Sequence, residues 1–166
     1  MLVDITIIDF MKDFTFLIGS TVCHQLTERS ISINDNFLPV CARCTGIYFS
    51  IFLSSFILFI KGRFKGNKIF SIPQTLILCL CLIPFMVDGA GSYLGIWNTN
   101  NFIRIITGAF AGFALPFFVI LIFNFNVEGV NEKIILKDTK EEFFILSLCL
   151  ICVMFIYYQI FNFKII

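Results

Sequence analysis

The stretch FIRIITGAFAGFALPFFVILIFNF, residues 102–125, decides the fold. It is almost wholly apolar and carries a single charged residue, Arg104. A helix needs about 20 apolar residues to cross the hydrocarbon core of a bilayer. Three further apolar runs come close to that length or exceed it: residues 45–60, 72–96 and 143–163. The sequence therefore predicts an all-α fold, a polytopic membrane helical bundle of about four transmembrane helices in a single membrane domain, residues 1–166.

The chain as a whole is far more apolar than a soluble domain. Of its 166 residues, 58% are hydrophobic and 17% aromatic, and the mean hydropathy is +0.94. A soluble domain is only about half apolar. Nothing in the formal net charge of +1 suggests nucleic-acid binding. The expected partner is therefore the lipid bilayer and not nucleic acid.

The first 22 residues do not resemble a full span. Their apolar part, residues 14–22, is too short to cross a bilayer. Asp4, Asp9 and Lys12 interrupt the preceding stretch, which differs in this from the apolar core of a secretory signal. We therefore expect residues 1–22 to form an interfacial or re-entrant helix of the mature protein.

Basic residues cluster in two of the three loops between the predicted spans. Loop 61–71 contains four Lys or Arg residues and no acid, and loop 126–142 contains three lysines. Cytoplasmic loops are enriched in Lys and Arg. We therefore expect both loops to be cytoplasmic in a multi-pass protein of the cell membrane. The polar segment 23–44 then lies at the extracytoplasmic face.

That polar segment carries three cysteines and the only histidine of the chain. It reads CHQLTERSISINDNFLPVCARCTG from residue 23 to residue 46. Cys41 and Cys44 form a CxxC pair, with Cys23 and His24 upstream of it. Thiolate and imidazole ligands suit zinc or another thiophilic metal. The pattern predicts a metal site with Cys23, His24, Cys41 and Cys44 as ligands. A site of three cysteines with His24 beside it is the other form, because adjacent residues normally point apart.

Two other interpretations of these thiols remain open. A CxxC pair with a third cysteine is also expected in a membrane thiol–disulfide oxidoreductase that acts on a thiol partner protein. A structural disulfide from Cys23 to Cys41 or Cys44 would hold the polar segment on the bundle. The remaining cysteines fall in apolar runs, where we expect them to pack as small hydrophobic residues: Cys79, Cys81, Cys149 and Cys152.

Two charged residues lie inside the predicted spans. Asp88 and Arg104 fall toward the same end of neighbouring spans. Charges inside a membrane are costly, so they pair with one another or serve a function. We therefore expect either an Asp88–Arg104 ion pair or a role in facing a ligand. The GxxxG spacing of Gly108 and Gly112 is expected to pack the third span against the second.

The predicted topology brings further polar residues to the membrane face that carries the cysteines. The arginines are candidate clamps for an anionic lipid or headgroup, and the carboxylates and the histidine are candidate acid–base groups. A third hypothesis is therefore an enzyme or carrier for a lipid-like anionic ligand. The catalytic candidates are Asp88, Arg104, His24 and Glu28, and the other polar residues of this predicted site are Arg29, Arg43 and Asn101.

Five sequence elements follow one another between residues 23 and 112. They are CHQ, ERS, PVCARCTG, the Asp88–Gly89 pair and NFIRIITG. In these elements the chain resembles the family of small bacterial and archaeal membrane proteins known as domain of unknown function 2085. The resemblance implies a membrane protein and joins Asp88 and Arg104 to the cysteine segment as parts of one pattern. It implies no particular reaction.

Overall fold

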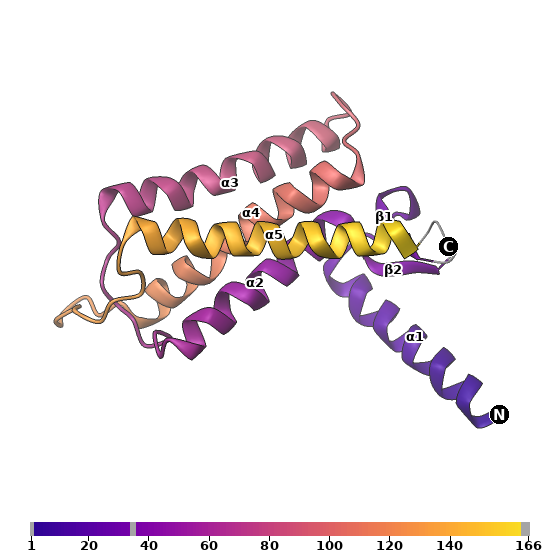
Figure 1. Cartoon of the computed structure of the whole chain (residues 1–166), viewed down its shortest axis with the longest axis horizontal. Coiled ribbons are helices and arrows are strands. Elements are labelled where there is room, and N and C mark those ends of the chain that lie inside the picture. The colour runs from indigo at the N-terminus through magenta and orange to yellow at the C-terminus, as the bar shows by residue number, and fades with distance from the viewer. Residues whose placement is uncertain (1, 34–35, 164–166) are drawn as a thin grey trace.

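The computed structural model describes residues 2–33 and 36–163 (Figure 1). In chain order its elements are α1 (Leu2–Val22), the 3-10 helix η1 (Thr27–Arg29), β1 (Ser30–Ile33), β2 (Asn36–Cys41), α2 (Ala42–Ile60), α3 (Ile72–Tyr93), α4 (Asn101–Asn124) and α5 (Thr139–Phe163). The two strands form one small antiparallel sheet, and every other described element is a helix.

Within the described part of the chain, four helices are long and apolar enough to cross a membrane. They are α2, α3, α4 and the Thr139–Gln159 part of α5. This confirms the predicted fold class, a membrane helical bundle with four candidate spans. The apolar window of α4 is 61% buried, against 22–28% for the other three. Helix α4 is therefore the central helix, and it packs against α2, α3 and α5 (Figure 1).

Helix α1 leaves the bundle at an angle (Figure 1). Its carboxyl end is held by Gln25, whose side-chain amide donates to the carbonyl oxygens of Phe16 and Pro39, both at 2.8 Å. It is not among the described helices that are apolar enough for a span. The structure thus confirms a helix at the amino terminus, and its interfacial position stays a prediction.

The polar segment after α1 forms a β-hairpin that the sequence did not predict. Strands β1 and β2 pair with Ser30 opposite Cys41. Asn101 at the start of α4 donates to the carbonyl oxygen of Ser30 at 3.3 Å and so ties the hairpin to the bundle. Because β2 ends at Cys41 and α2 begins at Ala42, the hairpin runs directly into the first span. Cys41 is thereby held at the N-cap of α2.

The turn between α3 and α4 begins earlier than the apolar run suggested. The run extends to residue 96, but α3 ends at Tyr93. Gly95 follows with a φ of +70°, a left-handed conformation that glycine adopts without strain at helix ends. Asn100 then caps α4 by accepting the amide of Ile103 at 2.9 Å. This turn places the last residues of α3 beside the first turn of α4.

Glycines allow α2 and α4 to approach closely. A Cβ on Gly46 of α2 would overlap a carbonyl oxygen of α4, and Cβ atoms on Gly108 and Gly112 would overlap carbonyl oxygens of α2. The GxxxG pair therefore packs the third span against the first, and our expectation that it packs against the second is wrong. The reason is that α2 brings its own glycine to this crossing, whereas α3 meets α4 through side chains such as Asp88 and Thr107.

We expect Gly108→Val to lower the free energy of unfolding by about 1–3 kcal/mol, because added volume in a packed contact strains the backbone. The valine would collide with the carbonyl group of Arg43 and push α2 away from α4. Unfolding by SDS titration of the purified protein in detergent measures the effect. Gly89→Ala is the matched control, since the nearest atom to its added Cβ lies 4.0 Å away. Equal losses in the two variants would contradict the prediction.

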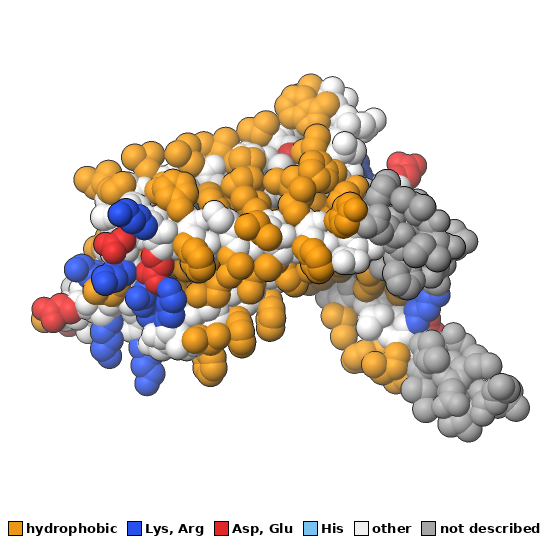
Figure 2. All heavy atoms as spheres, viewed as in Figure 1, with side chains coloured by type: hydrophobic (Ala, Val, Ile, Leu, Met, Phe, Trp, Pro, Cys, Tyr) orange, Lys and Arg blue, Asp and Glu red, His pale blue; other side chains and the backbone are white. Residues whose placement is uncertain are grey.

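The two basic loops meet at one end of the bundle. Glu141 at the start of α5 pairs with Lys61 and, at 2.5 Å, with Arg63. The amide of Asn67 donates to the carbonyl oxygen of Lys133 at 2.9 Å. Figure 2 shows basic and acidic side chains gathered at this end, next to the apolar flank of the helices. The hairpin and α1 lie at the opposite end (Figure 1).

Candidate functional site

Three cysteines meet at the hairpin end of the bundle. Cys23 follows α1, Cys41 ends β2, and Cys44 lies in the first turn of α2. Their Sγ atoms all lie within 4.8 Å of one another. The amide of Cys41 donates to the sulfur of Cys23 at 3.3 Å. All three thiols are partly buried and free of disulfide bonds. The hairpin thus closes the gap of 18 residues between Cys23 and Cys41.

His24 stands apart from this thiol cluster. The three cysteine sulfurs lie close to one another, but the imidazole of His24 does not belong to this group. The side chain of His24 is exposed, although it lines the same cavity as the thiols. Of the four predicted ligands, three are therefore brought together, and a role for His24 as a ligand stays a prediction.

The thiol cluster favours a thiolate at Cys41. A hydrogen bond from the Cys44 side chain lowers the pKa of Cys41 from its usual 9.0 to about 5, although burial acts to raise it. Further hydrogen bonds from the Cys44 backbone and the Cys23 side chain also lower the pKa of Cys41. The thiolate is the form of cysteine that attacks electrophiles and binds metals. These contacts therefore favour the ionised form of Cys41.

A pH series tests this ionisation. In metal-free protein we expect the alkylation rate of Cys41 to stay nearly constant from about pH 8 to about pH 6 and to fall below about pH 5, because only the thiolate reacts. Mass spectrometry of the alkylated Cys41 peptide measures the rate. In Cys44→Ala the strongest stabilising hydrogen bond is lost, so the midpoint should move up toward the usual thiol value of 9.0. A wild-type midpoint already at that value would contradict the prediction.

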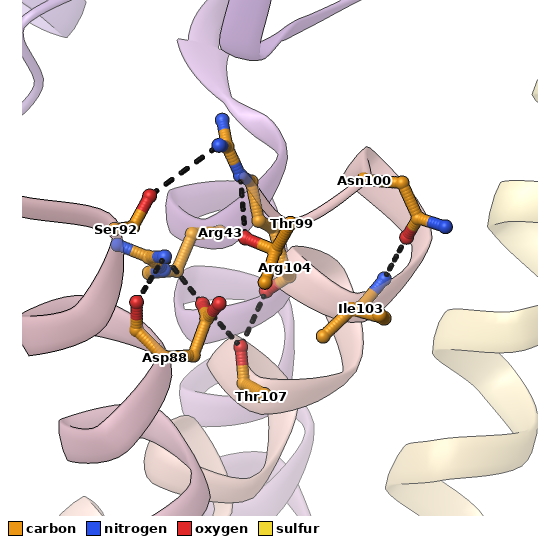
Figure 3. A network of polar contacts seen from close by, with 8 residues as sticks. All are labelled: Arg43, Asp88, Ser92, Thr99, Asn100, Ile103, Arg104 and Thr107. Atoms are coloured by element: carbon orange, nitrogen blue, oxygen red, sulfur yellow. Dashed lines mark hydrogen bonds and ion pairs between the residues drawn. The ribbon is translucent and has the colours of Figure 1, made fainter. Parts of the chain in front are cut away.

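Asp88 of α3 pairs with Arg43 of α2. The carboxylate is buried, and its Oδ2 accepts hydrogen bonds from Arg43 Nη2 and, at 3.2 Å, from the Thr107 hydroxyl. The predicted ion pair with Arg104 is therefore wrong. Arg43 takes this place because the close approach of α2 to α4 brings its side chain across to α3, as Figure 3 shows. One charged pair and Thr107 thus join three spans.

Arg104 is buried without a carboxylate partner among the described residues. Only 5% of its surface is exposed. Its Nε donates to the Thr99 hydroxyl at 3.1 Å, and its Nη2 donates to the Ser92 hydroxyl at 3.4 Å. In Figure 3 Ser92 lies between the Arg104 guanidinium and the Arg43–Asp88 pair. Neutral hydroxyls therefore hold this guanidinium in position without balancing its charge.

The thiol cluster and the arginines open onto one cavity of about 450 Å³. Its polar lining includes Cys23, Cys41, Cys44, Arg29, Arg43 and Arg104. No Asp or Glu belongs to the described lining. The cavity therefore combines soft metal ligands with an excess of guanidinium groups, and it lies between the hairpin, α2, α3 and α4.

The remaining predicted site residues lie outside this lining. Glu28 is exposed, Asn101 is used in holding the hairpin, and Asp88 pairs with Arg43 instead of reaching the cavity. Sequence reasoning missed Ser92 and Thr107, whose hydroxyls hold Arg104 and Asp88. Helical spacing carried a signal for both: Ser92 follows Asp88 by four residues and Thr107 follows Arg104 by three, so each pair shares a helix face.

Fold and cavity together define the class of this molecule, a multi-pass membrane protein with thiols and arginines gathered at one end of its helical bundle. The chain belongs to the family described as predicted membrane protein (DUF2085), whose model matches residues 23–118. The resemblance seen in the sequence is thereby confirmed. With the exception of Val22, every residue that lines the cavity falls inside the matched region.

Two relatives come from methanogens, and both are described as uncharacterised proteins. The protein of Methanocaldococcus jannaschii is 36% identical over 114 residues, which cover 69% of this chain and 71% of the relative. The protein of Methanothermobacter thermautotrophicus is 35% identical over 97 residues, which cover 57% of this chain and 80% of the relative. No solved structure matches the chain.

Proposed function

We propose that the protein binds one zinc-like ion through Cys23, Cys41 and Cys44. The observation that carries this proposal is the mutual distance of the three Sγ atoms, at most 4.8 Å. Tetrahedral zinc with Zn–S bonds of about 2.3 Å places its sulfur ligands about 3.8 Å apart. Small side-chain rotations would bring the thiols to that spacing. With three protein ligands, such an ion would have a fourth position for a ligand or a water molecule, which the cavity lined by the thiols could supply.

The surroundings of the thiols support a metal site over a structural disulfide. A disulfide joins two of three neighbouring sulfurs and leaves the third without a role. The amide of Cys41, which donates to the sulfur of Cys23, is the kind of outer contact that orients a thiolate ligand. The thiolate form, which the hydrogen bonds to Cys41 favour, is the form that a metal needs.

The orientation of the site in the membrane is part of the proposal. Both basic loops lie at the end of the bundle opposite the thiols. Lys and Arg in short loops favour the cytoplasmic side. The thiol cluster therefore faces the outside of the cell membrane, where a bound metal would protect it from oxidation. Labelling of a cysteine placed at position 65 in intact cells, with an impermeant maleimide, checks this orientation, and ready labelling would contradict it.

Elemental analysis of the purified wild type tests the metal site. About one equivalent of zinc or iron per chain is the expected content for a single site of this kind. A fully folded protein without metal would contradict the proposal.

Thiol–disulfide exchange is the second candidate function, and the lowered pKa of Cys41 at the N-terminus of α2 favours it. The Cys41 thiolate would attack a disulfide of a partner protein, form a mixed disulfide and release one partner thiol. Cys44 would then resolve the mixed disulfide, leaving a Cys41–Cys44 disulfide and a fully reduced partner. Thiol trapping in cells distinguishes the two candidates: a pair that cycles between redox states supports exchange, and a permanently reduced pair supports the metal site.

A further inference from the structure

The charge of Arg104 is left unbalanced in the buried part of the site. Burying a cation without an anionic partner is unfavourable, because the ion loses its hydration and gains no opposite charge in return. The hydroxyls of Ser92 and Thr99 satisfy two of its N–H groups but carry no negative charge. The Asp88 carboxylate of α3 is already engaged by Arg43. The guanidinium therefore has no ion-pair partner of its own among the described residues, and it lines an open cavity.

A second arginine on the same cavity also has no ion-pair partner among the described residues. The Arg29 side chain, at the end of η1, forms no hydrogen bond or ion pair with the described residues, although it is half-buried. It approaches the cavity from the hairpin side, whereas Arg104 approaches from α4. Guanidinium groups that converge from separate elements are suited to bidentate recognition of phosphate or carboxylate oxygens.

Part of the remaining cavity wall is apolar. Leu26, Ile47 and Phe85 line it beside the polar groups. Such a wall offers contact to the hydrocarbon or glycerol part of an amphiphile, while the arginines hold its charged end. A cavity of about 450 Å³ also falls in the size range of sites for small molecules.

We propose that this cavity binds a phosphate-class oxyanion between Arg29 and Arg104. The ligand is either a phosphorylated lipid headgroup or a free phosphate, and its oxygens supply the negative charge that the two guanidinium groups lack. This site goes beyond the proposed metal site, because the arginines and not the thiols hold the anion. The anion would nevertheless lie in the same cavity as the open metal position.

Calorimetry of the whole protein in uncharged detergent tests the anion site with two probes, inorganic phosphate and dihexanoyl phosphatidic acid. Each of Arg29→Gln and Arg104→Lys is expected to weaken binding by about tenfold or more. The first variant loses a charged contact to the anion, and the second loses a bidentate hydrogen-bonded contact. Arg104→Lys keeps the buried charge, so folding is preserved, and Arg29→Gln changes a half-exposed side chain. Lys65→Gln, an equal charge change in the loop at the far end, should bind as the wild type does.

The two probes distinguish the source of the phosphate group. Binding of phosphatidic acid about tenfold tighter than phosphate, a difference of about 1.4 kcal/mol, assigns a lipid headgroup. Equal affinities assign a free oxyanion. Failure of both probes to bind, or wild-type affinity in both arginine variants, would overturn the proposal.

The metal content of each variant keeps this test separate from the proposed function. Arg29→Gln and Arg104→Lys should retain the wild-type metal content while losing the anion. A Cys41→Ser/Cys44→Ser variant that still binds the probe would show that the anion site stands without the metal. If the cysteine variant alone loses probe binding and both arginine variants keep the wild-type affinity, the anion binds to the metal ion. That result would overturn the arginine site.

Discussion

Replacing both Cys41 and Cys44 by serine is expected to reduce bound zinc from about one equivalent per chain to nearly none. Two of the three thiolates of the proposed site are lost, and Cys23 alone cannot hold the ion. Structural zinc sites contribute about 10–16 kcal/mol of apparent binding free energy at neutral pH, so removing most of their ligands leaves negligible affinity. Elemental analysis of protein purified without added metal measures the outcome.

The same double substitution should also lower the unfolding midpoint. In the wild type the ion would connect the segment after α1 to the end of β2 and the first turn of α2, which are otherwise joined by hydrogen bonds such as Cys41 amide to Cys23 sulfur. The matched control is Cys79→Ser/Cys152→Ser, because these cysteines lie in α3 and α5, outside the thiol cluster. Unchanged zinc in the Cys41 and Cys44 variant would remove the basis of the metal site.

Asp88→Ala is expected to lower the free energy of unfolding by about 3–5 kcal/mol, the usual cost of breaking a buried ion pair by removing one partner. The substitution leaves Arg43 without its counter-ion and takes the acceptor from Thr107. Both losses fall where α2, α3 and α4 meet. SDS titration of the purified protein in detergent measures the change, and Glu128→Ala, an exposed acid in the distant loop, is the matched control.

A double variant shows how much of this cost comes from the uncompensated charge. Replacing both partners, in Arg43→Leu/Asp88→Leu, removes the two charges together, so its loss should be smaller than that of Asp88→Ala. If Asp88→Ala lowers the free energy of unfolding no more than Glu128→Ala does, the ion pair does not hold the spans together. If the double variant loses as much as the single one, the cost lies in packing and not in charge.

Most of the fold follows from the length and hydropathy of the apolar runs. A helix satisfies its own backbone hydrogen bonds, so an apolar run of sufficient length forms a span wherever it lies in the chain. This is why the four spans were predictable, and why their bounds shifted by only a few residues, as at Tyr93 of α3. The β-hairpin was not predictable, because its short strands depend on contacts with α1 and α4, as the Asn101–Ser30 hydrogen bond illustrates.

The candidate site was predictable in its residues but not in its pairings. The CxxC spacing singled out Cys41 and Cys44, and the cost of intramembrane charge singled out Asp88 and Arg104. The partner of Asp88 depended on which helices touch. Because glycines bring α2 against α4, Arg43 reaches the carboxylate, and Arg104 is left to line the cavity.

Hydropathy and residue type thus established a four-span membrane bundle with thiols and arginines near one end, since these properties depend on local composition. The meeting of Cys23 with the CxxC pair depends on distances between segments far apart in the chain. So does the pairing of Asp88 with Arg43, which leaves Arg104 without an ion-pair partner among the described residues. Such distances arise from helix packing and from the hairpin. No local pattern encodes them, because each is a property of two or more elements together.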